Sequence, residues 1–528
     1  MAPERTPARW VWAAAVLVGT ALRAWRLPTQ IPVDDEWHAL HRVVDSSYGE
    51  IALSFGFVDH CIPLTLFYKL AADTTGLGDV AFRAPTLLAG IALLIVAPWL
   101  LRDRLTPWTQ AGFAWLLALS PLLIFYSRFA RPYALAALLS FLAVERAARI
   151  AERPTARDAR LYGLAAALAI YVLPPSAPFV FAPALVWLFA PPIRSAGDAV
   201  ARLRPLGWAL ALTSALVLPP LLAHPEFVFG KLGVGGYPTP DALARAGAFW
   251  LTPSPWLAAL AVVGIAAGAW NLSRAAPRFV ACAGASVLAL ALAIFAAAPA
   301  YAWLGFVLGR YALPALPFAC LALALAPELA ARRLPGLLHA TACIAFGGLL
   351  LAASGVPRAL ADTPAWFPSR WVTEIEGTPP EPRQVPEFYR SLAEQPAGSV
   401  NLVEAPWIYG LWNNALPAYA ALHRQHVRIG FTEGVCSALA WGQYPQDSGI
   451  ALRAFVSLAN DAALEALGAD YVVLHRDPLG ELARVIDPID AKATEIPHIE
   501  GCARALIAKG WRPVHGDDAL LALAPPTE

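Results

Sequence analysis

The sequence predicts a polytopic α-helical membrane protein whose last third forms a separate water-soluble α/β domain. Of 528 residues, 58% are hydrophobic and only 15% are charged, whereas soluble proteins carry about a quarter charged residues. Apolar runs of about 20 residues recur, which is the length that a helix needs to cross the hydrocarbon core of a bilayer. After residue 355, charged residues return at the frequencies of soluble proteins.

Apolar runs place eleven predicted spans along the first two thirds of the chain. They are 10–27, 82–101, 108–127, 131–147, 160–173, 175–191, 206–223, 255–270, 279–298, 312–328 and 335–354. Arginines gather in alternate connecting loops, for example at Arg102, Arg149 and Arg274. Because positive residues in short loops stay in the cytoplasm, the N-terminus is expected inside. An odd number of spans then puts everything after residue 355 outside the cytoplasm.

The C-terminal third divides into a predicted surface linker, 355–398, and an extracytoplasmic α/β domain, 399–528. The runs Ser399–Glu404, His426–Gly430, Asp470–His475 and Ala519–Ala524 are typical of β-strands, and Leu452–Leu467 and Ile499–Lys509 of helices. Alternating strands and helices favour a layered α/β domain.

The six cysteines show no metal-ligand spacing. Cys61, Cys282, Cys320 and Cys343 fall in or beside apolar runs, where a small buried side chain is expected. Cys436 and Cys502 belong to the outer domain, and a disulfide between them is left open. Asp477, Asp517, Asp518, His475 and His515 offer metal-ligand atoms, but strand-end acids and surface histidines explain them better. No cofactor is predicted, and a divalent metal is possible but not indicated. The net charge of +1 argues against a nucleic-acid partner.

The first outer loop, residues 28–81, carries three consecutive acids. Asp34, Asp35 and Glu36 precede an amphipathic helix expected to lie in the membrane interface, with Trp37, Leu40 and Val44 on one face. Three adjacent carboxylates repel one another, which favours proton uptake by one of them and suits a general base. An N-cap aspartate followed by ordinary first-turn acids accounts for the same pattern.

A second polar stretch contains Asp59 and His60, and the end of the third span contains Arg128 and Arg131. Positive charge otherwise avoids the predicted outer side. The two arginines are therefore either interface anchors or a clamp for an anionic head group, which the forked guanidinium suits.

These segments, in this order, resemble the GT-C membrane glycosyltransferases. The resemblance covers residues 10–330 and is closest to the dolichyl-phosphate-mannose/protein mannosyltransferase-like group, which includes the lipid A aminoarabinose transferases. The segments are Asp35-Glu36, His60 to Tyr68, Phe82-Arg83-Ala84-Pro85, Ser120-Pro121, Tyr126-Ser127, Ala130 to Leu135, and Gly309 to Pro317.

The resemblance implies an inverting transferase in a bacterial cytoplasmic (inner) membrane. Its partners would be a polyprenyl-phosphate-linked sugar, membrane lipids, and a lipid, glycan or protein acceptor at the outer face. Asp35 would be the general base, with Asp34 and Glu36 as neighbours. Arg131, Arg310, Arg128 and Lys231 would hold the donor phosphate, and Asp59, His60, Tyr126, Tyr133 and Tyr311 would line the site. The chain departs from the family at Phe129, where relatives often carry an acid.

Two other functions fit the membrane class. A transporter or flippase for lipid-linked sugars is expected to carry ionisable residues and paired helix breaks within its spans. Here the predicted spans hold few charges, which favours chemistry at the outer surface. A non-catalytic envelope assembly protein would leave the acidic first loop and the outer arginines unexplained.

Overall fold

The computed structural model describes residues 5–55, 61–189, 196–225, 236–299, 301–327, 336–377, 385–406, 416–436, 449–476 and 498–526. The chain forms two compact units. We call Met1–Trp25, Ser46–Phe67 and Arg83–Val356 the helical unit. We call Arg26–Asp45, Tyr68–Phe82 and Pro357–Glu528 the sheet unit. Each unit is described by itself.

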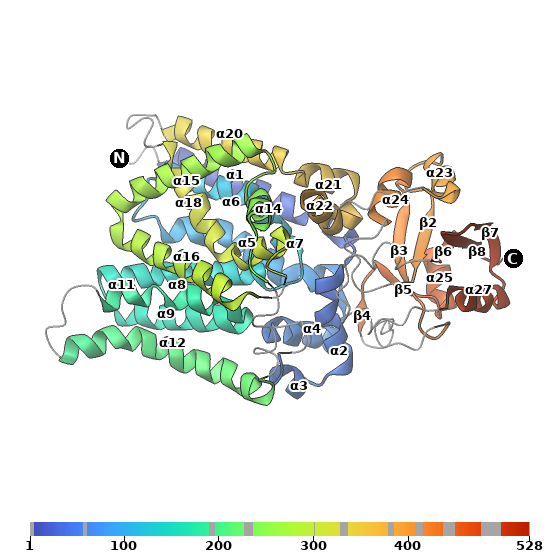
Figure 1. Ribbon diagram of the computed structural model, residues 1–528, viewed down its shortest axis with the longest axis horizontal. Coiled ribbons are helices and arrows are strands. Elements are labelled where there is room, and N and C mark those ends of the chain that lie inside the picture. The colour runs from blue at the N-terminus through green and yellow to red at the C-terminus, as the bar shows by residue number, and fades with distance from the viewer. Residues whose placement is uncertain are drawn as a thin grey trace. The chain divides into compact units, whose positions relative to one another are not determined.

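Helices occupy every predicted span (Figure 1). They are α1 (Arg5–Ala24), α5 (Asp79–Leu100), α6 (Pro107–Leu119), α7 (Pro121–Arg128), α8 (Tyr133–Glu152), α9 (Ala156–Val172), α10 (Ala177–Phe181), α11 (Ala184–Leu188), α12 (Ala196–Ala223), α15 (Pro255–Ala275), α16 (Pro277–Ala297), α17 (Gly305–Tyr311), α18 (Leu316–Leu325) and α20 (Gly336–Ala353). Shorter helices are α3 (Tyr48–Ala52), α4 (Ile62–Thr74) and α14 (Pro240–Trp250). Within the described residues, five helices are long and apolar enough to cross a membrane, or up to seven if each bent pair is one span. The chain is therefore a multi-pass membrane protein, but the predicted number of eleven spans is not confirmed.

Two pairs of helices are bent at a break, one inside the predicted span 108–127 and one that begins before the predicted span 312–328. The axes of α6 and α7 differ by 60°, and those of Gly305–Tyr311 and Leu313–Leu325 by 55°. Ser120, between α6 and α7, is extended with ψ of 119°. A residue before proline avoids the α conformation, and proline supplies no backbone N–H, so Pro121 ends the first helix and starts the second.

Small residues let the helices pack closely. In Figure 1, α8, α9 and α12 lie side by side. A Cβ on Gly268 of α15 would collide with the carbonyl oxygen of Ala322 in α18. Close approach at small residues supplies the dispersion contacts that hold helices together within lipid.

Ion pairs lie at the ends of α8 and α9 on the side predicted to be cytoplasmic. The buried Glu145 carboxylate of α8 pairs with Arg146 at 3.1 Å and with Arg149. Arg146 also pairs with Asp158 of α9 at 2.9 Å. Several of the arginines that predicted the topology are thus paired, which offsets the cost of burying Glu145.

The sheet unit contains a six-stranded sheet with the order β5-β3-β2-β6-β8-β7. Its strands are β2 (Asn401–Ala405), β3 (His426–Phe431), β5 (Phe455–Ser457), β6 (Tyr471–His475), β7 (Arg512–Gly516) and β8 (Leu520–Ala524). The first four in spatial order pair in parallel, and β8 is antiparallel to both β6 and β7. The four predicted strands are confirmed, and β7 was not predicted.

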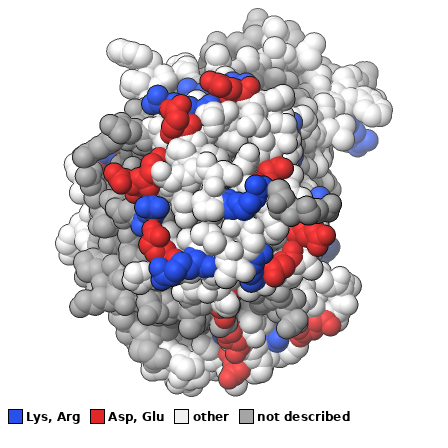
Figure 2. Space-filling view, turned by 90° about the vertical axis from the view of Figure 1, so that its right-hand side faces the viewer, with Lys and Arg blue, Asp and Glu red and all other residues white. Residues whose placement is uncertain are grey.

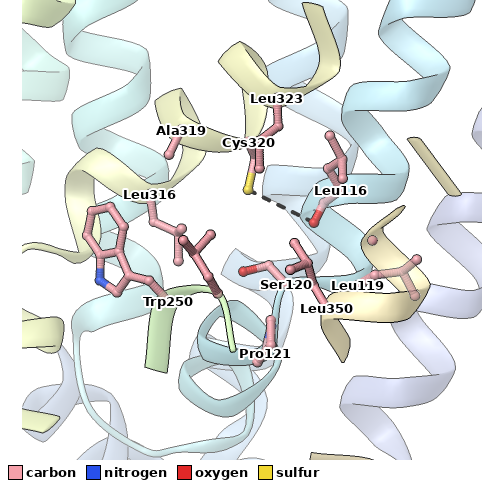
Figure 3. Close-up of a pocket in the computed structure, with 12 residues that line it drawn as sticks. Leu116, Leu119, Ser120, Pro121, Trp250, Leu316, Ala319, Cys320, Leu323 and Leu350 are labelled. Carbon is pink, nitrogen blue, oxygen red and sulfur yellow. Dashed lines mark hydrogen bonds between the residues drawn. The ribbon is translucent and has the colours of Figure 1, made fainter. Parts of the chain in front are cut away.

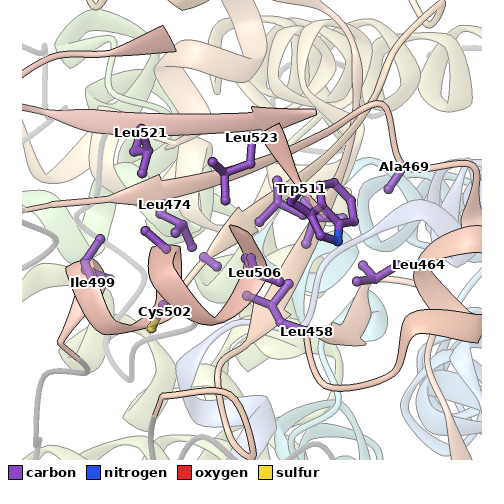
Figure 4. Close-up of a cluster of buried hydrophobic side chains, with 14 of the residues drawn as sticks. Leu458, Leu464, Ala469, Leu474, Ile499, Cys502, Leu506, Trp511, Leu521 and Leu523 are labelled. Carbon is purple, nitrogen blue, oxygen red and sulfur yellow. The ribbon is translucent and has the colours of Figure 1, made fainter. Parts of the chain in front are cut away.

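The helix predicted over Leu452–Leu467 is wrong in its first half. Residues Phe455–Ser457 form β5, which pairs with β3, and only α25 (Asp461–Leu467) is helical. Pairing with an existing strand outweighs the weak helical pattern, because strand propensity depends strongly on context. The other predicted helix is α27 (Ile499–Ala508). Both helices pack on one face of the sheet around a core that includes Val403, Leu506 and Leu523 (Figure 4).

The predicted linker is helical and belongs mostly to the sheet unit. It forms α21 (Val356–Asp362), η5 (Pro364–Trp366), α22 (Phe367–Glu376) and α23 (Glu387–Ala393). The first outer loop supplies a backbone hydrogen bond to this region, from the Ile31 N–H to the Ala365 carbonyl at 2.8 Å. It also supplies β1 (Leu77–Gly78), which pairs with β4 (Ile450–Ala451). Parts of the first loop therefore fold together with the C-terminal third.

The interfacial helix of the first loop is α2 (Trp37–Asp45). Its buried positions include Ala39, Leu40 and Val43, whereas Val44 is half-buried. The predicted apolar face was therefore one position off at Val44, because Val43 is the residue that follows Leu40 at the three-residue spacing of a helical stripe.

The surface of the molecule mixes both signs of charge. On the face shown in Figure 2, blue basic and red acidic side chains alternate among uncharged ones. The described residues of that face therefore form no extended area of one sign, of the kind that steers polyanions.

Cys436 and Cys502 form a disulfide across a sequence separation of 66 residues, with their Cα atoms 4.8 Å apart. This answers the question that the sequence left open. The other four cysteines are buried, as predicted, and none of them forms a disulfide within the described residues. Closing a loop of this length removes disorder from the unfolded chain and stabilises the fold by about 4 kcal/mol.

We expect the disulfide to be formed in cells, because the predicted position of the C-terminal domain outside the cytoplasm exposes it to oxidising conditions. In denatured, unreduced protein, four of the six cysteines should react with a maleimide that adds mass, and all six should react after reduction. Reaction of all six without reductant would contradict an extracytoplasmic C-terminal domain.

Candidate functional site

The two helix bends bring predicted site residues together inside the helical unit. The ring of Tyr126 in α7 lies 4.7 Å from that of Tyr133 in α8 and stacks on Phe306 of α17 at 6.0 Å. The Arg310 guanidinium lies 5.7 Å from the ring centroids of both Tyr133 and Tyr311. Four of the residues predicted to form the site are thus one cluster. A cation over aromatic faces is held by their quadrupoles and keeps its charge available.

Arg131 lies in the short connection between α7 and α8, directly beside this cluster in sequence. The residue is only 5% exposed, and its backbone N–H donates to the Phe129 carbonyl at 2.7 Å. Phe129 itself is buried against Phe125, with centroids 5.1 Å apart. The position at which relatives often carry an acid is therefore filled by an apolar contact. A buried guanidinium is well suited to an anion, because a low-dielectric surrounding strengthens their attraction.

Arg128 holds the end of a helix. Its Nη1 donates to the carbonyls of Leu22, Arg23 and Trp25 at 3.3, 3.0 and 2.8 Å. These carbonyls lie at the C-terminal end of α1, where no following turn supplies donors. Arg128, one of the predicted phosphate ligands, thus has a clear structural task.

Arg23 performs the corresponding task for α6 and was not predicted as a site residue. Its guanidinium donates to the carbonyls of Leu117 and Ala118 at 3.0 and 3.1 Å, next to the Pro121 break. Its Nε donates to Ser127 Oγ at 3.1 Å. Because Arg23 is fully buried, its bonds fix α1 against both halves of the broken helix. An arginine near the end of an apolar span was the only sign of this role in the sequence.

Replacing Arg23 by Met should destabilise the protein strongly. Each carbonyl left without a donor in a buried site costs about 1–3 kcal/mol, so the unfolding temperature in detergent should fall by many degrees. Arg9→Met, at an exposed position of the same helix, is the matched control and should change little. Equal stabilities of the two variants would show that the Arg23 bonds do not hold the bend.

An apolar cleft opens beside the bent helices (Figure 3). It is lined by Leu116, Leu119, Ser120, Pro121, Trp250, Leu251, Leu316, Ala319, Cys320, Leu323, Gly347 and Leu350. The enclosed space is small, about 20 Å³, which is room for roughly one water molecule. Trp250 connects the cleft to the arginine cluster, because its Nε1 donates to the carbonyl of Gly309 at 3.0 Å. An apolar chain in this cleft would therefore have Arg310 near one end.

The acidic triplet lies in the sheet unit. Asp34–Glu36 form the 3₁₀ turn η2, which leads directly into α2. The Val33 N–H donates to Glu36 Oε2 at 3.3 Å, and the Glu36 N–H donates to the Val33 carbonyl at 2.8 Å. Glu36 is fully buried and accepts a backbone N–H just before the helix, whereas the sequence had offered an aspartate as the capping residue. Asp35 is 9% exposed.

Several predicted residues cannot be placed. Asp59, His60 and Lys231, and the side chain of Asp34, lie outside the described residues. Arg131 and Arg310 belong to the helical unit and Asp35 to the sheet unit.

The ligand atoms considered for a metal do not gather. His515 pairs with Asp517 at 3.1 Å, and His475 pairs instead with Glu404 at 2.7 Å. Asp477 lies outside the described residues. Within the part of the chain that the structure describes, no group of three or more His, Cys, Asp and Glu side chains is placed to hold a metal ion.

No protein-family model and no curated protein matches the chain. Among solved structures, ArnT from Cupriavidus metallidurans bound to undecaprenyl phosphate is 15% identical, with 98% of this chain and 97% of that chain covered and a TM-score of 0.43. The oligosaccharyltransferase AglB from Archaeoglobus fulgidus, in complex with an inhibitory peptide and a dolichol-phosphate, is 13% identical, with 100% of this chain and 75% of that chain covered and a TM-score of 0.44.

At these identities and TM-scores the similarity carries no argument about the activity or the substrates of this chain.

Proposed function

We propose that the protein is an integral membrane glycosyltransferase that moves a sugar from a polyprenyl-phosphate donor to an acceptor at the outer face of the membrane. The observation that carries the proposal is the cluster of Arg310, Tyr126 and Tyr133 at two helix bends beside an apolar cleft. A polyprenyl phosphate is an apolar chain with an anionic end, and these two features match its two parts.

The donor phosphate is assigned to Arg310 and Arg131. Arg310 lies next to the break between α17 and the following helix, and Arg131, in the connection between α7 and α8, is almost fully buried. A phosphate taken out of water needs cationic partners, because an unpaired charge is costly in a low-dielectric groove. Arg128 is assigned a supporting role instead, because its Nη1 already serves three carbonyls of α1.

The isoprenoid chain is assigned to the apolar cleft. Its lining is made largely of leucine side chains from α6, α18 and α20, and Ser120 is its hydroxyl group. An apolar chain gains roughly 0.8 kcal/mol for each methylene buried in such a place. Binding of the chain there would bring the phosphate toward the arginines through Gly309 and Trp250.

The chemical step is one displacement with inversion. A hydroxyl or amine of the acceptor attacks the anomeric carbon, and the bond from that carbon to the phosphate oxygen breaks. The bonding electrons stay on the phosphate, whose added charge Arg131 and Arg310 stabilise. The acceptor's proton passes to Asp35. Of the two acids whose side chains are described, Asp35 is preferred as base, because Glu36 already accepts the Val33 N–H.

The direct test is a comparison of envelope glycans and glycolipids from a deletion strain and its parent by mass spectrometry. Loss of one sugar from one class of acceptor, with accumulation of its polyprenyl-phosphate donor, is expected. An unchanged set of glycoconjugates together with a changed distribution of the donor across the membrane would favour a flippase instead. An unchanged set with an unchanged donor would favour an assembly protein.

A further inference from the structure

A second polar site lies in the sheet unit, at the point where the order of its strands reverses. The parallel strands lie in the order β5-β3-β2-β6. The strands that follow β2 in the chain, β3 and β5, lie on one side of β2, and the next strand, β6, lies on its other side. The crossover from β2 to β3 contains α24 (Leu416–His423), whereas α25 and α27 cover the opposite face. In open α/β sheets, ligands bind outside the carboxyl ends of the two strands at such a switch point.

The carboxyl ends of these two strands carry Glu404 and His475. Glu404 Oε2 lies 2.7 Å from His475 Nε2 and accepts the Tyr389 hydroxyl at 2.8 Å. Because Val403 faces the core on the other side, Glu404 points to the face covered by α23 and α24. Glu404 is 2% exposed, whereas His475 is half-buried at the rim. The two residues are 71 positions apart, and only the sheet register joins them.

A stack of rings lines this cluster. Tyr419 and His423, one turn apart on α24, lie parallel to Tyr389 with centroids 4.3 and 5.5 Å away. The ring of His475 is parallel to Tyr389 at 6.5 Å. Burial raises the pKa of Tyr389 well above its usual value, and the Glu404 carboxylate raises it further. Tyr389 therefore stays a neutral hydrogen-bond donor.

The cluster has hydrogen-bonding capacity that its own members leave unused. His423 Nδ1 accepts the Gln425 N–H at 3.0 Å, which places the ring proton on Nε2. That Nε2 is buried and has no partner within the described residues. Burial lowers the pKa of His423 more than the nearby Glu404 raises it, so the ring is neutral. Glu404 Oε1 can accept a further hydrogen bond, because the bonds above use Oε2. When the His475 ring is neutral and donates from Nε2, its Nδ1 is also an acceptor.

This pattern selects among ligand classes. A protonated His423 Nε2 does not bind a metal ion, and the Glu404 carboxylate repels anions. Hydroxyl groups are both donors and acceptors, so a neutral polyhydroxylated ligand can meet the donor and the acceptors together. Leaving a buried donor without a partner is costly, and a ligand that accepts its hydrogen bond removes that cost.

We propose that Glu404, His475 and His423 form a binding site for a neutral sugar unit, at the carboxyl edge of the sheet. The proposal extends the proposed function, because a sugar site in this unit would recognise an acceptor glycan. It assigns to the C-terminal third a role in choosing the acceptor. It does not depend on turnover, so the two proposals fail separately.

Saturation-transfer NMR on the full-length protein in detergent tests the site without a donor. The probes are free hexoses, N-acetylhexosamines and pentoses, each at millimolar concentration. At least one class should receive saturation, and the signal should fall severalfold in Glu404→Gln and in His423→Phe. Lys509→Gln is the matched control, because its partner Asp461 belongs to the opposite face. Absence of signal from every probe, or equal signals in wild type and both site variants, would overturn the site.

A second measurement uses the unmodified chain, so it stands even if the variants fold poorly. Diethyl pyrocarbonate should acylate His475 at its half-buried ring, and the sugar that gives the NMR signal should slow this reaction severalfold. The exposed His426 serves as the internal control and should react at the same rate with and without sugar. Equal slowing at both histidines, or at neither, would count against the site. Asp35→Asn should bind the sugar as the wild type does. If the wild-type protein binds the sugar but shows no transferase activity, the sugar site stands and the proposed reaction is wrong.

Discussion

Replacing Asp35 by Asn is expected to lower the turnover by about 100-fold or more, because the amide cannot accept the acceptor's proton. The substitution preserves size, and Asp35 is not the acid that accepts the Val33 N–H. Folding and donor affinity should therefore remain close to those of the wild type. The measurement is the release of polyprenyl phosphate from the donor lipid found in the deletion strain, followed by mass spectrometry in the presence of its acceptor.

Three neighbouring variants make the result specific. Asp34→Asn should reduce turnover only mildly. Glu36→Gln should act on stability, because it weakens the acceptor of the Val33 N–H inside a fully buried site. If Asp35→Asn keeps near-full activity while Asp34→Asn or Asp59→Asn abolishes it, the base has been misassigned. If all these variants remain active in a verified assay, the first loop does not supply the base.

The positions of the membrane helices could be predicted from the sequence, but their bends could not. Apolar runs reveal length and burial, so the predicted spans coincide with helices. Pro121 lies inside the predicted span 108–127, and a proline in a membrane helix is often tolerated because its neighbours satisfy the freed carbonyls. Whether it bends the helix by 60° depends on a partner such as Arg23, which contacts the break from another helix.

The same limit applies to the roles of individual arginines. The junction after α7 was interpreted as an interface anchor or a phosphate clamp, and sequence spacing cannot distinguish Arg128 from Arg131. The structure separates them, because only Arg128 is shown donating to the end of α1. The pair Glu404 and His475 was missed for a similar reason. Each residue ends an unremarkable strand, and only the parallel register of β2 and β6 brings them together.

Replacing Arg310 by Ala is expected to weaken donor binding about tenfold or more. A hydrogen bond to a charged group contributes about 1.5–3 kcal/mol, and the guanidinium is held over Tyr133 and Tyr311 at 5.7 Å, ready to bind. Arg131→Ala should have a similar effect. Arg131 is buried, and a phosphate that loses a cationic partner in a buried site is left with a costly uncompensated charge. The measurement is the dissociation constant for polyprenyl phosphate in detergent, which separates donor binding from the chemical step.

Lysine substitutions and one matched arginine decide between a phosphate ligand and a packing residue. Arg310→Lys should restore only part of the affinity, because an ammonium is a point charge and cannot form the two parallel hydrogen bonds of a guanidinium. Arg274 lies 4.7 Å from the Trp270 ring centroid and so has the same kind of aromatic contact without belonging to the cluster. Arg274→Ala should leave donor affinity unchanged. If Arg310→Ala and Arg131→Ala also leave it unchanged, both arginines serve the packing of the bent helices, and the phosphate binds elsewhere. If Arg310→Lys binds as tightly as the wild type, charge alone holds the donor and the forked geometry has no part in selecting it.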